Sequence, residues 1–193
     1  MCHGSVGALR CKPVIQKRPG TKYSLWLMPT GDMCEHLTRT LQQLSAKHHA
    51  PEFSPHVTLL GGIVGPRREV IRKAARLAGL LHPFTVRLGK IDYLDEYFRC
   101  LFVRVTAANT LRVTHKVACE VFNRHYEPRF MPHLSLLYGN FSQSLKEAIV
   151  AELGTRIDLH FRVHSVHLCL TEGEPRYWRR EARFRLGQSA WKE

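Results

Sequence analysis

Apolar residues recur along the chain with two different periods, and these periods predict both strands and helices. Residues 22–28, KYSLWLM, alternate apolar and polar positions as a strand does. The segment that follows, up to about residue 48, instead carries Leu37, Leu41 and Leu44 at helical spacing. Thr30 stands just before this segment, where a helix cap is expected.

The rest of the chain continues to mix the two periods. Pro66 suits the first turn of a helix, and Gly154 is typical of a helix end. The expected elements are a helix over 66–81, a hairpin of strands 83–94 and 97–106, a helix from Asn109 to about His125, a helix from Ser142 to Leu153, and strands over 158–170 and 177–186. Strands interspersed with helices in this way predict a domain that combines sheets with packed helices.

One short motif occurs twice, 77 residues apart. FSPHVTLL spans residues 53–60, and FMPHLSLL spans residues 130–137. With that offset, eight of the fifteen positions from 48 to 62 are identical without a gap. A predicted helix precedes and follows each copy. The repeat therefore predicts two related lobes, each a small sheet with helices, packed about an approximate two-fold axis.

Each copy of the motif is expected to present a histidine and a hydroxyl on one face of a strand. Side chains alternate between the two faces of a strand, so the residues between the histidine and the hydroxyl point the other way, into the lobe. The face shared with the histidine is expected to hold His56, Thr58 and Leu60 in the first copy and His133, Ser135 and Leu137 in the second.

Two histidines across one cleft suit acid–base chemistry. A single histidine on a strand is usually a partly buried residue with a structural role. Two copies with the same flanking residues instead favour a catalytic site. Their ordinary pKa near 6.5 lets one be neutral and the other protonated close to neutral pH. The neutral imidazole can take a proton from water, and the charged one can give a proton to a leaving oxygen. The two hydroxyls can donate hydrogen bonds to a phosphate, and this set needs no metal.

The two motifs resemble the twin H-x-T/S-x signatures of the 2H phosphoesterases. YSLWLMP, FSPHVTLL, FMPHLSLLYG and VHLCLTEG also lie in the order found in cyclic phosphodiesterases of the plant and yeast type, over about residues 22–186. The resemblance implies a bilobal α+β fold with two pseudo-symmetric antiparallel sheets and outer helices around a central cleft. It also implies a hydrolase without metal or cofactor. Its substrates would be nucleoside 2′,3′-cyclic phosphates or ADP-ribose 1″,2″-cyclic phosphate, a by-product of tRNA splicing.

The resemblance also implies a role for particular residues. His56 and His133 would be catalytic, and Thr58 and Ser135 would bind the substrate. Tyr138 matches an aromatic residue that contacts substrate in the family, although a core tyrosine at a strand end is the alternative. The first motif is followed by Gly-Gly where the second has Tyr-Gly, so the two lobes are not equivalent. Which histidine is the base stays open.

The charge of the chain is strongly positive. It has 29 Lys+Arg against 16 Asp+Glu, a formal net charge of +13. Such a surface attracts polyanions such as RNA, nucleotides and acidic membranes, although a solubilising surface with a basic tail is an equal explanation. RREVIRKAAR, residues 67–76, is expected to be a solvated helix face rather than a phosphate grip. YWRREARFRLG, residues 177–187, is expected to be an edge strand rather than a nucleic-acid surface.

The ends and the cysteines give weaker indications. Residues 1–21 are expected to be a flexible basic extension, and residues 22–193 a single phosphodiesterase domain of two interleaved lobes. The extension could instead be an organelle leader; otherwise a cytoplasmic monomer is expected. The six cysteines show no disulfide spacing, and the twelve histidines show no metal-binding spacing.

Two other functions fit the same residues. One is a 2H phosphodiesterase that acts on the ends of longer RNA, which the positive charge favours. The other is a basic nucleotide- or RNA-binding module without activity, which the intact histidine and hydroxyl pairs disfavour.

Overall fold

A computed structural model describes residues 21–188, and the basic extension predicted at the N-terminus lies almost entirely outside these residues. The strands are β1 (Lys22–Leu27), β2 (Val57–Val64), β3 (Phe84–Tyr93), β4 (Leu101–Thr106), β5 (His133–Leu137), β6 (His160–Val163), β7 (Ser165–Leu170) and β8 (Arg179–Arg185). The helices are α1 (Asp32–Lys47), α2 (Arg67–Leu80), α3 (Asn109–Val121) and α4 (Gln143–Leu153), with short 3-10 turns at Tyr97–Arg99 and Pro175–Tyr177.

All the strands form one curled antiparallel sheet, in the order β6-β3-β4-β5-β2-β1-β7-β8. A single ladder pair, Val57 with Leu134, joins its two four-stranded halves. These halves are the two predicted sheets, and the α+β fold with outer helices is confirmed. The halves are interleaved along the chain, because β1 and β2 belong with β7 and β8 while β3 to β6 form the other half.

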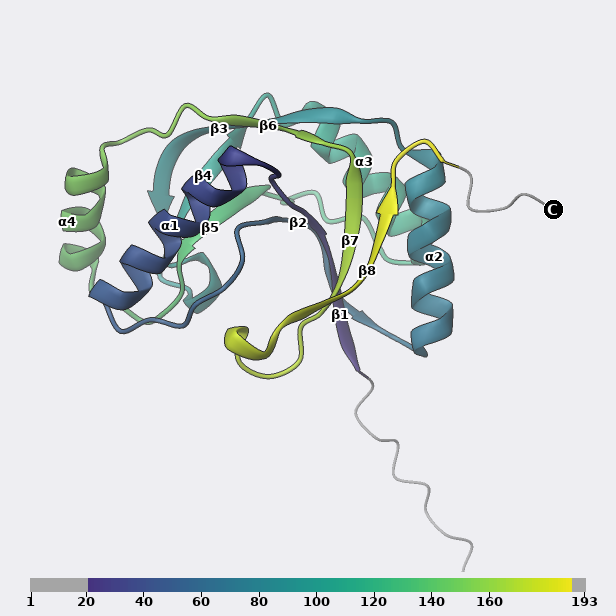
Figure 1. Cartoon of the computed structure of the whole chain (residues 1–193), viewed down its shortest axis with the longest axis horizontal. Helices are drawn as coiled ribbons and strands as arrows, with labels where there is room; N and C mark the ends of the chain where they lie inside the picture. Colours follow the sequence, from purple (N-terminus) through teal and green to yellow (C-terminus); the bar gives the residue numbers. More distant parts are fainter. Residues whose placement is uncertain (1–20, 189–193) are drawn as a thin grey trace, which may run out of the picture.

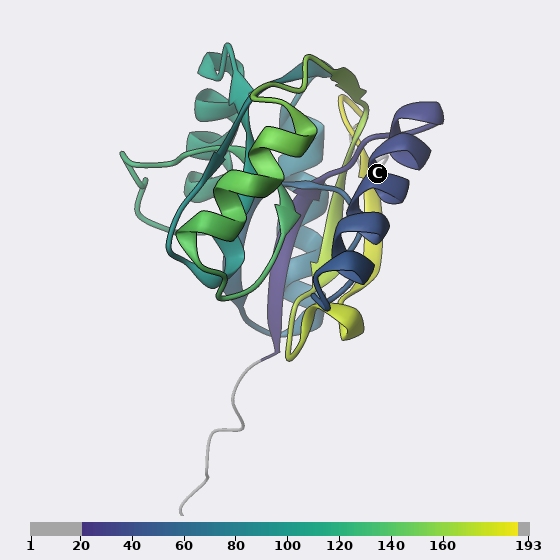
Figure 2. The ribbon, with the colours of Figure 1, turned by 90° about the vertical axis from the view of Figure 1, so that its left-hand side faces the viewer.

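The helices cover the outer sides of the two halves (Figures 1 and 2). Helices α1 and α4 contact β5 and β3, whereas α2 and α3 contact β7, β8 and β2. Each motif strand is therefore backed by a helix of the other copy of the repeat: α1 backs β5, and α3 backs β2. No helix among residues 21–188 is both long and apolar enough to span a membrane.

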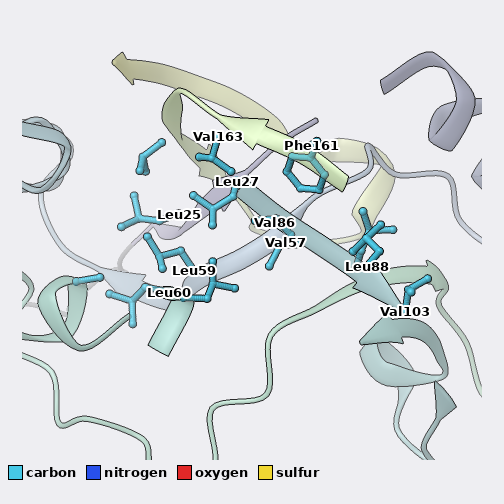
Figure 3. Close-up of a cluster of buried hydrophobic side chains, with 14 of the residues drawn as sticks. Leu25, Leu27, Val57, Leu59, Leu60, Val86, Leu88, Val103, Phe161 and Val163 are labelled. Carbon is cyan, nitrogen blue, oxygen red and sulfur yellow. The ribbon is translucent and has the colours of Figure 1, made fainter. Parts of the chain in front are cut away.

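The core is built from alternate residues of the strands and one stripe of each helix. Figure 3 shows part of this core, with Leu25, Val57, Leu59, Val103 and Phe161 among the packed side chains. Burying one leucine or valine side chain contributes about 1.5–3 kcal/mol. The predicted helix stripes are confirmed as buried, for example Leu37, Leu41 and Leu44 in α1.

Several predicted boundaries differ from the structure. The strand predicted over 97–106 begins at Leu101, after a 3-10 turn, and the helix predicted to about His125 ends at Val121. Thr30 does not cap α1: Gly31 occupies that position with a φ of 61°, and no side chain caps the first turn. The segment 158–170 is two strands, because the chain breaks at His164 and crosses from β3 in one half to β1 in the other. Gly154 ends α4 as expected, with a φ of 86° that favours glycine.

The same irregularity interrupts both motif strands. In β1–β2, Trp26 pairs with Thr58 but Leu25 pairs with Leu60, so one extra residue lies in β2. In β4–β5, Phe102 pairs with Ser135 but Leu101 pairs with Leu137. A bulge reverses the alternation of faces after the hydroxyl residue. Leu60 and Leu137 both pack in the core, and of the two only Leu60 also borders the cleft with His56 and Thr58.

Candidate active site

The two motif histidines line one cleft between the halves of the sheet. The cleft has a volume of about 790 Å³, and its lining includes the five residues singled out from the sequence: His56, Thr58, His133, Ser135 and Tyr138. His133 begins β5 and His56 directly precedes β2, the two strands that meet at the centre of the sheet. Residues 77 positions apart thus come to the same cavity because the two copies of the repeat face each other.

His56 is almost completely buried, with 5% of its surface exposed. Its ring stacks on Trp26, with the ring centroids 3.7 Å apart and the planes 13° apart. Its Nδ1 lies 2.6 Å from the carbonyl oxygen of Ser54. Because a carbonyl oxygen only accepts, Nδ1 carries the proton and Nε2 is left for proton exchange. Burial lowers the pKa of His56 to about 4, and the charge of His133 acts in the same direction.

His133 has a related but more open environment. Its Nδ1 donates to the carbonyl oxygen of Met131 at 2.8 Å, which again leaves Nε2 free. The nearest ring is Phe102, whose centroid lies 5.0 Å away at a 59° tilt. Burial lowers the pKa of His133, and the positive charges of Arg99 and Arg104 act in the same direction. Both histidines are therefore neutral near pH 7 in the free protein, and His56 is the harder one to protonate.

The two hydroxyl residues, Thr58 and Ser135, differ in burial and in hydrogen bonding. Thr58 is half-buried in the lining of the cleft. Ser135 is buried, and its Oγ donates to the carbonyl oxygen of Phe98 at 3.3 Å. A phosphate oxygen would have to displace that carbonyl in order to accept from Ser135. The two hydroxyls thus reach the same cleft, but only Ser135 has an intramolecular partner to leave.

Tyr138 combines the two roles considered from the sequence. Its ring lines the cleft and stacks on Phe53, with the centroids 3.9 Å apart, and 3% of its surface is exposed. Burial raises the pKa of Tyr138, so its hydroxyl remains protonated. Phe53, the first residue of the first motif, thus packs against the residue that follows the second motif. Phe130, its counterpart in the second motif, stacks on the buried ring of His115 at 3.8 Å.

Several aromatic residues of the cleft were not predicted as site residues. Trp26 covers His56, while Phe98 and Trp178 come from opposite halves and place their ring centroids 5.7 Å apart. The alternation of β1 could have placed Trp26 on the polar face, but nothing in the sequence indicates that Phe98 and Trp178 meet. Among residues 21–188, no group of three or more His, Cys, Asp or Glu side chains could hold a metal ion.

A family model and one curated relative each match most of this chain. The family model of the 2′-5′ RNA ligase superfamily matches residues 23–175. A curated relative, the cyclic phosphodiesterase of Arabidopsis thaliana, is 24% identical over 156 residues, which are 79% of this chain and 86% of the relative.

Solved structures of low identity share the fold. A phosphoesterase structure has a TM-score of 0.60 at 15% identity, covering 88% of this chain and 99% of that protein. TT0787 of Thermus thermophilus has a TM-score of 0.59 at 16% identity, covering 86% and 98%. E. coli LigT in complex with 3′-AMP has a TM-score of 0.57 at 16% identity, covering 88% and 99%.

Proposed function

Because the chain belongs to the 2′-5′ RNA ligase superfamily of 2H phosphoesterases, we propose that it is a cyclic phosphodiesterase that uses two histidines and no metal. The family and the Arabidopsis relative support a phosphodiesterase. The observation that carries the finer proposal is the pair of imidazoles in one cleft, each held by an Nδ1–H bond to a carbonyl oxygen two residues earlier.

The substrate class that we propose is a five-membered cyclic phosphate on a ribose. Nucleoside 2′,3′-cyclic phosphates and ADP-ribose 1″,2″-cyclic phosphate both present this ring, and the second would link the protein to tRNA splicing. The aromatic side chains of Trp26, Phe98 and Trp178 offer flat apolar surfaces to a base or ribose beside the histidines. Structures of LigT hold 3′-AMP, ATP and NADP⁺, which are small nucleotides of related shape.

The pKa order of the two histidines assigns their roles in this proposal. His56, with the lower pKa, takes the proton from the attacking water through Nε2. His133, which protonates more readily, gives a proton through Nε2 to the departing ribose oxygen. The water oxygen bonds to phosphorus as the P–O bond to that ribose oxygen breaks, and the product is a phosphomonoester. Thr58 and Ser135 donate to the non-bridging oxygens as negative charge grows there.

The test is hydrolysis of a 2′,3′-cyclic nucleotide by the purified full-length chain, followed by ³¹P NMR. We expect one phosphomonoester to form, and EDTA to leave the rate unchanged. The variant His56→Ala/His133→Ala is the matched control, because it removes both imidazoles and keeps the cleft. Turnover that this variant retains, or that EDTA abolishes, would contradict the two-histidine mechanism. We also propose a monomer in the cytoplasm, which chromatography with light scattering and imaging of a tagged chain would test.

A further inference from the structure

The edge strand β8 presents arginines to the cleft side of the sheet. Arg183 pairs with His167 of β7, and His167 pairs in turn with Trp26 of β1. Directly paired residues of antiparallel strands point to the same face, so Arg183 shares the face of Trp26, which lines the cleft. By the same ladders Arg180 lies beside Cys169 and Ser24, and Arg185 lies beside Ser165. We call Arg180, Arg183 and Arg185 the arginine row.

The opposite face of β8 packs against the core and α2, which agrees with the orientation of the row. Ala182 and Phe184 pack against the hydrophobic core on the side that α2 covers. Glu181 also serves that side, because it pairs with Arg67 of α2 at 2.9 Å. The row therefore lies on the cleft face of β8, while the residues between its members pack against the core and α2.

The guanidinium groups of the row carry uncompensated charge. All three side chains are at least partly exposed, and no carboxylate of residues 21–188 lies within salt-bridge distance of them. The neighbouring Arg179, by contrast, pairs with Glu181. The Nε of Arg183 donates to Ser165 at 3.0 Å, which fixes that guanidinium against the sheet with its other N–H groups free. Unpaired arginines on a concave surface attract phosphates, which they can bind through two parallel hydrogen bonds.

A buried histidine lies beneath the row and does not add to its charge. His167 is 5% exposed, and its Nδ1 has no hydrogen-bond partner among the described residues. Burial lowers the pKa of His167 to about 4, and the charges of Arg180 and Arg183 act in the same direction. Arg183 pairs directly with His167, so its side chain lies on the same face of the sheet as the imidazole. The lowered pKa keeps His167 neutral at neutral pH, and the positive charge here comes from the arginines.

The distances suit phosphates adjacent to the reacting one. Neighbouring strands lie about 4.8 Å apart, so β8 is roughly 14 Å from β2 and too far from His56 to hold the cyclic phosphate itself. Arg183 and Arg185 are two residues apart, or about 7 Å along the strand. That spacing is close to the separation of successive phosphates in an extended nucleic-acid strand.

From this geometry we propose that the arginine row binds the backbone phosphates of nucleotides on the 5′ side of a terminal 2′,3′-cyclic phosphate. The substrate class is then an oligoribonucleotide that ends in the cyclic phosphate, rather than the mononucleotide alone. This inference rests on the proposed function, since it takes the histidine cleft as the place of the terminal ring. The arginines of the row do not line the cleft itself, but they lie on the same face of the sheet as Trp26, which does.

The experiment compares two substrates and two triple variants. The substrates are a 2′,3′-cyclic mononucleotide and a hexaribonucleotide with a terminal 2′,3′-cyclic phosphate. The row variant is Arg180→Gln/Arg183→Gln/Arg185→Gln. The matched control is Arg68→Gln/Arg72→Gln/Arg76→Gln, which removes the same charge from α2, on the outer side of the same half.

We expect the row variant to lose about 10- to 100-fold in kcat/KM on the hexamer and less than about 2-fold on the mononucleotide. The slope of log(kcat/KM) for the hexamer against log salt should become shallower by about 2, because three phosphate contacts are lost from a single strand. The control should change neither value. Normal mononucleotide turnover shows that the row variant is folded. Arg180→Gln/Arg185→Gln, which keeps the bond of Arg183 to Ser165, should give a smaller loss of the same kind.

Several results would overturn the inference while the proposed function stands. One is an equal loss of kcat/KM on the hexamer in the row variant and the control variant, and another is no loss in the row variant. The third is a loss of kcat/KM on both substrates in a row variant that is folded. If the parent hydrolyses neither substrate, the proposed function fails. The row is then judged by fluorescence anisotropy with a labelled hexamer that ends in a 3′-phosphate, where only the row variant should bind more weakly. Binding of the parent to vesicles with anionic phospholipid but not to the hexamer would also overturn it.

Discussion

The ionisation of His56 gives the sharpest test of the active-site geometry. A fall of its pKa from 6.5 to about 4 corresponds to about 3 kcal/mol against the protonated form. Burial under Trp26 is the main cause, since the two rings stack with planes 13° apart. NMR titration of the free protein should therefore show His56 changing charge near pH 4. His133 should titrate below its ordinary pKa, because burial and the charges of Arg99 and Arg104 lower it.

These values set the expected pH dependence of the rate. The profile of kcat/KM reports the free enzyme, so its optimum should lie between about pH 4 and 6.5 rather than at neutrality. At pH 7 less than about a quarter of His133 would be protonated even if its pKa were 6.5. A bound cyclic phosphate is an anion and raises both pKa values, so the kcat profile should lie at higher pH than the kcat/KM profile.

The variant Trp26→Ala tests the cause. Water should reach His56, and its pKa should rise from about 4 toward 6.5, which narrows the kcat/KM bell from its acid side. Trp26→Phe is the matched control, because a ring remains over the imidazole and the pKa should stay low. Truncating the buried Trp26 costs about 3–5 kcal/mol, so both variants are first checked by far-UV circular dichroism. A parent protein in which His56 titrates near 6.5 would refute the reasoning without any variant.

Three further predictions concern single side chains. His56→Ala and His133→Ala should each lower kcat by about 100- to 10,000-fold with little change in KM, measured with a cyclic mononucleotide; a change in KM alone would place the residue outside the proton transfers. Thr58→Val should lower kcat about 100-fold or more. The loss of kcat in Ser135→Ala should be smaller than this by a factor of about 3 to 10, because the Ser135 hydroxyl must first leave the carbonyl of Phe98. Equal losses of kcat in the two variants would argue against that competition. His167→Leu should remove part of the acid sensitivity of folding: the parent's His167 has a lowered folded pKa, so its contribution falls by about 2–3 kcal/mol between pH 6.5 and 4.5. Urea denaturation at pH 7 and 4.5 measures this, and an unchanged difference between the two pH values would contradict it.

The sequence predicts those features of the fold that depend on local pattern. Helical spacing identifies all four helices of residues 21–188, and the 77-residue repeat identifies two lobes and both motif strands. The prediction of one strand over 158–170 misses the break at His164. There two consecutive polar residues, His164 and Ser165, interrupt the alternation of apolar positions. The pairing of β6 with β3 and of β7 with β1 places the two strands in different halves, and this pairing between distant segments is not given by the local pattern.

The site shows the same division. The repeat points directly to the two histidines and two hydroxyls, which the fold brings to one cleft. Their environments depend on residues far away in sequence: Trp26 lies 30 positions before His56 and sets its burial. A pKa near 6.5 for both histidines is therefore the natural expectation from sequence alone, whereas the packed structure lowers both. Phe98 likewise comes from a loop between β3 and β4, and only the fold brings it beside Trp178.

In the proposed mechanism, the roles of the two histidines follow from the differences between the two copies of the motif rather than from their likeness. Trp26 pairs with Thr58, and Phe102 pairs with Ser135, so the two aromatic residues occupy corresponding places beside the two motif strands. Trp26 lies flat on His56, but Phe102 is tilted at 59° to His133. The first imidazole is accordingly more dehydrated and harder to protonate. Two equivalent lobes would give two histidines of equal pKa and no preferred direction for the proton. In the proposed mechanism, the aromatic residue beside each histidine therefore sets the direction of proton transfer, which the repeat by itself would leave undetermined.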